Sequence, residues 1–336
     1  MKIESNTLLL PDSFLKEEER CGYRIPLSMK RVWAVQLDIL NRVLAICKKH
    51  DLKIWMAGGS LLGTIRHKGY IPWDDDLDVM LPREDYRKFC KVAPAELPSD
   101  MVLQNQYTEP SFHGYMTRIR KNQTAAIDIN EAVEGYVYNM GIYIDIFPLD
   151  SFPDSGRVAQ VLCSLSFALN KIRRCIHLPS RRFRSLNCTL KKKLIRLFCF
   201  PLRFRYLNSI FTRIDDSLFS SDWNRGGNSC VFGSSWWNMC SLGAPDFHRW
   251  MYKKKWFKET EQRPFEFLTV PVPANFDEIL KTSYGDWREM VQGGACHGDC
   301  VFDATQDYKK VLIERFGYIE SDFKILRRKK SCVDLA

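Results

Sequence analysis

The sequence predicts an α/β (α+β) fold, with helices flanking a mixed, mostly antiparallel β-sheet and a basic, mainly helical insertion between the two halves of the core. Three observations support this prediction. Apolar residues recur at helical spacing before residue 50, short apolar runs between turn signals are typical of strands, and a long cationic segment separates them from an aromatic-rich C-terminal part. A chain of 336 residues is long enough for one large domain with an insertion.

The first helix is predicted over residues 29–49, capped by Ser28, because its apolar side chains fall on one face: Trp33, Leu37, Leu40 and Leu44. Further helices are predicted over residues 61–66 (capped by Ser60), 82–92, 275–283 and 306–316. Strands are predicted over residues 53–57, 74–81, 102–105, 115–120 and 141–147, the last one ended by Pro148.

The domain organisation follows from where composition changes. We expect an irregular lead-in, a catalytic core, a basic helical insertion, a C-terminal part that completes the catalytic domain, and a mobile tail, over residues 1–27, 28–155, 156–220, 221–325 and 326–336.

The net charge of +10 and the sequence pI of about 9.0 indicate a polyanionic partner, such as an anionic membrane or a phosphorylated substrate. The charge is concentrated, because Lys171–Arg205 contains twelve Lys and Arg residues and no Asp or Glu. One interpretation is peripheral attachment to the inner face of the cytoplasmic membrane, and the other is an ordinary insertion with a charged outer face. Nucleic acid is not expected, because no nucleic-acid motif accompanies the charge.

The twelve cysteines are interpreted as reduced thiols of a cytoplasmic protein. The N-terminus has no apolar run long enough for a signal peptide, and no run of about 18 apolar residues predicts a transmembrane helix. Cys296, His297 and Cys300 have part of the spacing of a Zn²⁺ site, to which Cys230 or Cys240 would add a ligand. Paired C-x₂-C elements are missing, which favours ordinary cysteines over Zn²⁺.

Four aspartates crowd into the otherwise mostly apolar segment Gly69–Leu81, GYIPWDDDLDVML. On a strand, Asp74, Asp76 and Asp78 would share one face and Asp75 would point the other way. Three buried and unpaired carboxylates would be very costly, whereas Mg²⁺ (or Mn²⁺) prefers such oxygen ligands. The alternative is a solvated acidic loop, which the apolar flanking residues disfavour.

Two further elements accompany the aspartates. Gly58, Gly59 and Ser60 lie between an apolar strand and a helix, a geometry that lets backbone N–H groups cradle a phosphate. Asp145 lies inside the apolar strand GIYIDIF, where it would complete a metal site from an adjacent strand or deprotonate an attacking hydroxyl. The alternative for Asp145 is a buried carboxylate satisfied by backbone donors.

The ordered motifs GGSLLGTIRHKGYIPWDDDLDVMLPREDY, TRIRKNQT, GIYIDIFPLD and LKTSYGDW resemble the LicD family, which includes the fukutin relatives, within the nucleotidyltransferase superfamily. The resemblance covers residues 30–150 and 265–315. It implies a nucleotidyltransferase-like sheet and a metal-dependent phosphotransferase. Such an enzyme moves phosphocholine or an alditol phosphate from a CDP-linked donor to a glycan, such as lipopolysaccharide or teichoic acid, and releases CMP.

The resemblance also implies residue roles. Asp76, Asp78 and Asp145 match the catalytic, metal-binding carboxylates, with Asp74 beside them as a further metal ligand. The residues implied in donor binding are Gly58, Gly59 and Ser60 in the phosphate turn and, as phosphate contacts, Arg66, His67, Arg118 and Lys121.

Two other functions remain open from the sequence. The first is a nucleotidyltransferase that transfers a nucleoside monophosphate. The second is a catalytically silent glycan- or membrane-binding relative, which the intact aspartates disfavour. The Trp-rich stretch that contains Trp223, Trp236, Trp237, Trp250 and Trp256 suggests an aromatic cage for choline, or else ordinary core packing.

Overall fold

The computed structural model describes residues 10–109, 116–152, 228–232, 247–292 and 300–323, together with the single residues 8, 111, 112, 114, 157, 161, 165, 168 and 214. Most of the predicted insertion at 156–220 and the whole predicted tail at 326–336 lie outside this part of the chain. Within it, no helix combines the length and apolar composition needed to cross a membrane.

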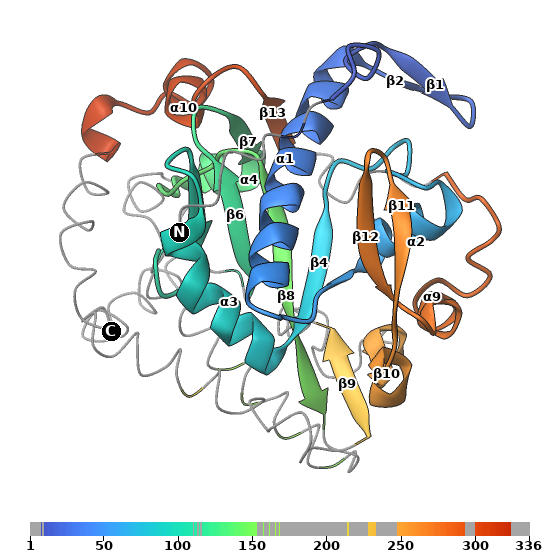
Figure 1. Cartoon of the computed structure of the whole chain (residues 1–336). Helices are drawn as coiled ribbons and strands as arrows, with labels where there is room; N and C mark the ends of the chain where they lie inside the picture. Colours follow the sequence, from blue (N-terminus) through green and yellow to red (C-terminus); the bar gives the residue numbers. More distant parts are fainter. Residues whose placement is uncertain are drawn as a thin grey trace.

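A seven-stranded mixed sheet organises the core, which confirms the predicted fold class (Figure 1). The strand β8 runs through its centre, parallel to β4 on one side and antiparallel to β6 and β9 on the other. The remaining described pairings of the sheet are antiparallel. Its strands are β3 (Trp55–Met56), β4 (Asp78–Pro82), β5 (Met101–Gln104), β6 (Thr117–Lys121), β8 (Tyr143–Phe152), β9 (Ser229–Phe232) and β10 (Met251–Lys253).

Strand β8 continues beyond Pro148, where the sequence predicted its end. The reason lies in its antiparallel partners. Strand β6 pairs with β8 as far as Ile146, and β9 pairs with it from Leu149 onward. Pro148 falls in the gap between these two partners, where a missing N–H removes no antiparallel ladder bond.

Two helices, α1 (Leu27–Lys49) and α3 (Arg83–Glu96), cross the same face of the sheet (Figure 1). Helix α1 buries Trp33, Leu37 and Leu40 as its apolar pattern predicted. The predicted cap is wrong, because α1 already begins at Leu27 after Pro26, and Ser28 lies within its first turn. A proline tolerates this position, since its fixed φ suits the helix start and the missing N–H would have no helical partner.

Smaller elements surround this centre. Part of the lead-in expected to be irregular is a hairpin of β1 (Glu18–Arg20) and β2 (Tyr23–Ile25). A second core holds α4 (Ile129–Glu134), α10 (Tyr308–Phe316), β7 (Ala125–Asp128) and β13 (Cys300–Asp303). The other elements are α2 (Gly58–Arg66), α9 (Phe276–Tyr284), the hairpin β11 (Thr260–Phe265) and β12 (Leu268–Pro273), and the 3₁₀ turns η3 (Phe247–Trp250), η4 (Lys254–Phe257) and η5 (Glu320–Phe323).

Candidate active site

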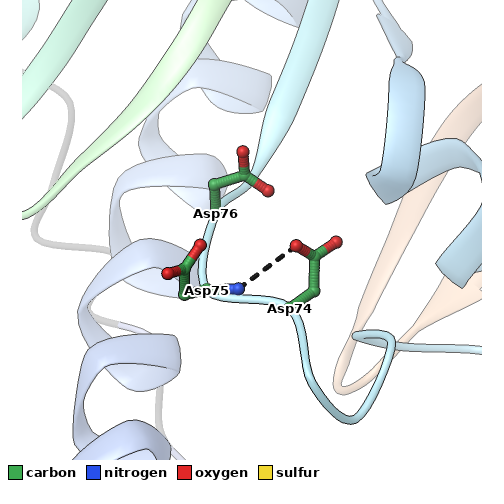
Figure 2. A group of neighbouring side chains, drawn as sticks. All are labelled: Asp74, Asp75 and Asp76. Atoms are coloured by element: carbon green, nitrogen blue, oxygen red, sulfur yellow. Dashed lines mark hydrogen bonds between the residues drawn. The ribbon is translucent and has the colours of Figure 1, made fainter. Parts of the chain in front are cut away.

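The aspartates lie in a loop that leads into β4 and not along a strand face, which corrects the sequence prediction. The strand begins only at Asp78, so the expected alternation does not apply before it. Carboxylate oxygens of Asp74, Asp75 and Asp76 lie within 4.8 Å of one another (Figure 2). Asp75, which we expected to face away from its neighbours, therefore belongs to the cluster.

Helix α1 explains why this segment is a loop. The indole Nε1 of Trp33 donates to the carbonyl oxygen of Asp74 at 3.1 Å. The amide Nε2 of Gln36 donates to the carbonyl oxygen of Asp75 at 2.9 Å. These bonds satisfy backbone acceptors that a neighbouring strand would otherwise occupy, so the loop is held by a buried helix face.

Asp78 and Asp145 come together through strand register. They are direct partners in the parallel ladder of β4 and β8, and the N–H of Asp145 donates to the carbonyl oxygen of Leu77 at 2.9 Å. Their charges interact, and the charges of Asp74 and Asp76 also act on Asp78. Strand register therefore sets Asp145 beside Asp78, and the charges of all three other predicted metal-binding carboxylates act on Asp78.

The electrostatics of this cluster favour a bound cation. Burial, followed by the charges of Asp76, Asp145 and Asp74, raises the pKa of Asp78 well above its usual value. Burial and the neighbouring Asp76 raise the pKa of Asp74 in the same direction. The Oδ1 atom of Asp78 is buried without a hydrogen-bond partner among the described residues. Carboxylates that repel one another, with an unsatisfied oxygen, fit a hard divalent cation such as Mg²⁺.

The Gly58-Gly59-Ser60 turn lies directly against these carboxylates. Helix α2 begins at Gly58, so Ser60 is inside the helix and does not cap it, which corrects the expectation. Its hydroxyl instead accepts a hydrogen bond from the N–H of Asp78 at 2.8 Å. A Cβ added at Gly59 would lie 2.8 Å from Oδ2 of Asp74. Glycine here lets the helix N-terminus approach the acidic cluster, where a phosphate and its cation would meet.

The close approach at Gly59 gives a testable expectation. Gly59→Ala should displace the Asp74 carboxylate, lower Mg²⁺ affinity and reduce kcat/KM by about 10²-fold, the cost of a misplacement near 1 Å. Thermal shifts in a Mg²⁺ titration and steady-state kinetics measure both effects. Thr64→Ser, one turn further along α2, is the control and should preserve both. Unchanged Mg²⁺ affinity in Gly59→Ala would contradict this expectation.

Arg118 is placed at the site by an ion pair. Its Nε donates to Oδ1 of Asp145 at 2.7 Å, and its guanidinium carbon lies 4.0 Å from the ring centroid of Tyr143. Both contacts come from strands that neighbour each other, β6 and β8. Arg118 therefore holds the Asp145 carboxylate in position, a role that the sequence did not reveal.

Arg66 and His67, at the end of α2, have partners other than a phosphate in this structure. Arg66 Nη1 donates to the carbonyl oxygens of Trp287 and Glu289 at 3.0 and 3.1 Å, and its Nε donates to Nε2 of His67 at 3.0 Å. Burial and the charges of Arg66 and Arg20 lower the pKa of His67 to about 4. His67 is thus neutral near pH 7 and accepts a hydrogen bond, which does not suit a cationic phosphate contact.

The depressed pKa of His67 predicts a pH effect on stability. Above the unfolded pKa near 6.5, the ring is neutral in both states and costs nothing. As pH falls from 6.5 toward 4, the unfolded chain binds a proton that the folded chain refuses, so folding stability is lost. His67→Gln should therefore lose less melting temperature than the wild type between pH 7.5 and pH 5. An equal loss in both proteins would contradict this expectation.

Lys121 is a predicted site residue whose ion-pair partners lie elsewhere in the fold. It ends β6 and forms ion pairs with Asp38 at 3.0 Å and Asp100 at 2.7 Å. Asp145 pairs instead with Arg118, three residues earlier on the same strand. Lys121 is therefore engaged with α1 and with the segment before β5, and its predicted contact with the donor has no geometric support.

Two weaker predictions fall largely outside the described residues. Cys296, His297 and Cys240 are not described, whereas Cys230 is fully buried and Cys300 pairs with Asp128 in a separate two-stranded sheet. Of the tryptophans, Trp256 is buried in the core, and Trp250 packs edge-on against Tyr284 at 6.0 Å. Packing, and not a cage, is what the structure shows for Trp256.

Sequence reasoning missed two residues at the site. Asp75 was assigned to the opposite face because a strand was assumed. Tyr284 stands in the motif LKTSYGDW, but nothing in its spacing linked it to the aspartates. In the structure, its hydroxyl oxygen lies 3.9 Å from the position of a Cβ at Gly58, which Asp78 Oδ2 also borders at 3.3 Å.

Comparison with known proteins agrees with this geometry. The sequence pattern of the family described as "LicD/FKTN/FKRP, nucleotidyltransferase domain" matches residues 51–157, which contain every aspartate of the cluster. The chain is 26% identical over 277 residues to the lipopolysaccharide cholinephosphotransferase LicD of Haemophilus influenzae, covering 79% of this chain and 92% of that protein.

More distant similarity links the chain to animal proteins. It is 26% identical over 114 residues to the mouse ribitol 5-phosphate transferase FKRP, covering 34% of this chain and 20% of that protein. The human FKRP is 27% identical over 88 residues, covering 26% and 18%. The resemblance to the LicD family seen in the motifs is confirmed by these matches, and residues 51–157 match the LicD/FKTN/FKRP nucleotidyltransferase domain.

Proposed function

We propose that this protein is a metal-dependent phosphotransferase. It moves phosphocholine or a related alditol phosphate from a CDP-linked donor to a hydroxyl of a cell-surface glycan, and CMP leaves. The names of its relatives, a lipopolysaccharide cholinephosphotransferase and two ribitol 5-phosphate transferases, support the reaction class. They differ in the transferred group, so choline, ribitol and glycerol donors all remain to be tested.

The observation that carries this proposal is that two of the predicted metal-binding carboxylates, Asp74 and Asp78, meet the N-terminus of α2. Asp78 Oδ2 lies 3.3 Å from the position of a Cβ at Gly58, and Asp74 Oδ2 lies 2.8 Å from that at Gly59. A diphosphate needs both kinds of partner, since helix N–H groups bind its oxygens and a cation offsets its charge. An acidic cluster alone would repel the donor.

The residues present fit a divalent cation, and Mg²⁺ or Mn²⁺ would be held by Asp74, Asp76, Asp78 and Asp145. When bound, the cation neutralises phosphate charge that develops during transfer. Of these ligands, Asp145 pairs with Arg118, and its charge acts on Asp78.

In the proposed reaction, the acceptor hydroxyl oxygen forms a bond to the phosphorus distal to cytidine. The bond from that phosphorus to the bridging oxygen breaks, and CMP carries the electron pair away. The hydroxyl proton goes to Asp145, which Arg118 orients through the 2.7 Å bond. Most of the catalysis then comes from positioning and charge stabilisation, as is general for phosphoryl transfer.

A transfer assay with two labels tests the reaction. The chain is incubated with Mg²⁺, a glycolipid acceptor and CDP-choline, CDP-ribitol or CDP-glycerol, labelled either in the head group or in the cytidine. Head-group label in the glycan, with the cytidine label recovered as CMP, is the expected result. Cytidine label in the acceptor would show a nucleotidyltransferase instead. Neither label in any acceptor, with donor binding intact, would favour the catalytically silent relative.

The distribution of positive charge suggests where the enzyme works. We propose that it acts at an anionic membrane surface on the cytoplasmic side, because the net charge is +10 and twelve cationic residues lie within Lys171–Arg205. Co-sedimentation with anionic and neutral vesicles tests this, since only anionic vesicles should retain the protein, and added salt should release it.

A further inference from the structure

Helix α9 is fastened so that its last residue, Tyr284, has a defined place. The Ser283 hydroxyl donates to the carbonyl oxygen of Arg249 at 3.0 Å and shares a 2.8 Å bond with the Tyr252 hydroxyl. The ring of Trp250 meets the Tyr284 ring edge-on. Both sides of the helix end are thus held by the segment around η3, which precedes β10.

The chain turns away immediately after Tyr284. Gly285 has φ +71° and ψ −123°, a conformation that side chains with a Cβ rarely adopt. The turn leads to Trp287 and Glu289, whose carbonyl oxygens accept hydrogen bonds from Arg66 of α2. Helices α2 and α9 therefore pack against each other, and Arg66, the last residue of α2, binds the segment that follows α9 (Figure 1).

This arrangement places the Tyr284 hydroxyl over the first residue of α2. A Cβ added at Gly58 would have two side-chain neighbours within 4 Å: Oδ2 of Asp78 at 3.3 Å and the hydroxyl oxygen of Tyr284 at 3.9 Å. The phenol and the acidic cluster thus border the same point at the helix N-terminus. Tyr284 is also 38% exposed, so its edge remains accessible to a ligand.

The phenol suits this place because it donates a hydrogen bond without carrying charge. A lysine or arginine there would pair directly with the aspartates and compete with a cation. A tyrosine phenol has an ordinary pKa of about 10, so near pH 7 the hydroxyl keeps its proton and can donate a hydrogen bond. The N–H groups at the start of α2 offer donors to a phosphate oxygen at this point, whereas the unsatisfied Oδ1 of Asp78 offers an acceptor to its cation.

We infer that Tyr284 is a binding residue for the nucleoside diphosphate donor, and that its hydroxyl donates a hydrogen bond to a phosphate oxygen seated between α2 and the aspartate cluster. This inference rests on the proposed function, because it takes the donor to be a CDP-linked molecule. It assigns the C-terminal motif LKTSYGDW to the same site as the motifs at residues 58–81.

Equilibrium binding of CDP to the full chain in the presence of Mg²⁺ tests the inference without requiring turnover. Tyr284→Phe keeps the ring contact with Trp250 and removes only the hydroxyl. Loss of one hydrogen bond to a charged group should weaken CDP binding by about 10-fold, and the melting temperature of the apo protein should stay close to wild type.

Tyr252→Phe is the matched control, because its hydroxyl bonds to Ser283 in the neighbouring residue of α9. That variant should melt at a lower temperature and bind CDP as the wild type does. Equal CDP affinity in Tyr284→Phe and wild type, or an equal loss in Tyr252→Phe, would overturn the inference. Tyr284-dependent CDP binding without CMP release from any donor would support the inference and contradict the proposed reaction. A wild type that binds no CDP would contradict both.

Discussion

Asp78→Asn is expected to reduce Mg²⁺-dependent turnover strongly and, at the same time, to raise the melting temperature of the metal-free protein. Asp78 is the most constrained carboxylate of the cluster: its Oδ1 is buried without a partner among the described residues, and the charges of Asp76, Asp145 and Asp74 act on it. A neutral amide removes that repulsion. Each kcal/mol regained should raise the melting temperature by about 2–4 °C.

The same change removes a metal ligand and the charge that the cation would balance. Turnover should fall by about 10³-fold, the scale of losing a preorganised electrostatic contact at a reacting phosphate. The stabilisation that Mg²⁺ gives the wild type should disappear in Asp78→Asn. Differential scanning fluorimetry with Mg²⁺ or EDTA measures this, and a CMP-release assay measures turnover.

Asp100→Asn is the control for Asp78→Asn, because Asp100 pairs with Lys121 away from the cluster and its side chain is 48% exposed. It should preserve the Mg²⁺-dependent shift. A destabilised Asp78→Asn protein that still gains stability from Mg²⁺ would show that the cluster is not the cation site.

Arg83→Met is expected to destabilise the fold by about 3–5 kcal/mol, the typical cost of leaving one buried charge without its partner. Arg83 begins α3 and makes two hydrogen bonds to Asp150 of β8, at 2.6 and 2.7 Å. Both side chains are almost fully buried. The pair joins α3 to the part of β8 that lies beyond Pro148, so it helps to fix the strand that carries Asp145.

A double variant separates charge from packing. Arg83→Met with Asp150→Leu removes both buried charges and should recover much of the lost stability. Arg24→Met is the control, since its ion pair with Glu17 is exposed to solvent, and it should cost far less stability than Arg83→Met. Urea unfolding measures all three. A small loss in Arg83→Met, similar to that in Arg24→Met, would contradict the expected role of the buried pair.

The fold was predictable where a regular spacing of apolar residues, or a short apolar run between turn signals, determines a helix or a strand. Helix α1 follows from a clean apolar face, and the sheet follows from short apolar runs. The errors occur where tertiary contacts decide the outcome. Trp33 and Gln36 hold Asp74 and Asp75 in a loop, and Pro148 is tolerated because β8 changes partners beside it.

Prediction of the candidate site from the sequence was limited in the same way, because tertiary contacts decide which side chains meet. The glycines and aspartates carry their chemistry in their type and spacing, so the sequence pointed to them directly. Arginines and lysines do not, because any of them can bind a phosphate, a carboxylate or a carbonyl. Arg118 pairs with Asp145, Arg66 holds a loop, and Lys121 pairs with Asp38. Tyr284 could not be found from its sequence position, since only the packing of α9 on α2 brings it to the aspartates.

The most direct test of the central claim is CMP release from CDP-choline, CDP-ribitol and CDP-glycerol, each with glycan acceptor, in Mg²⁺ and in EDTA. We predict CMP from one of these donors in Mg²⁺, none in EDTA, and none from Asp76→Asn, whose carboxylate belongs to the cluster. CMP release that survives both EDTA and Asp76→Asn would contradict a metal-dependent site built on these aspartates.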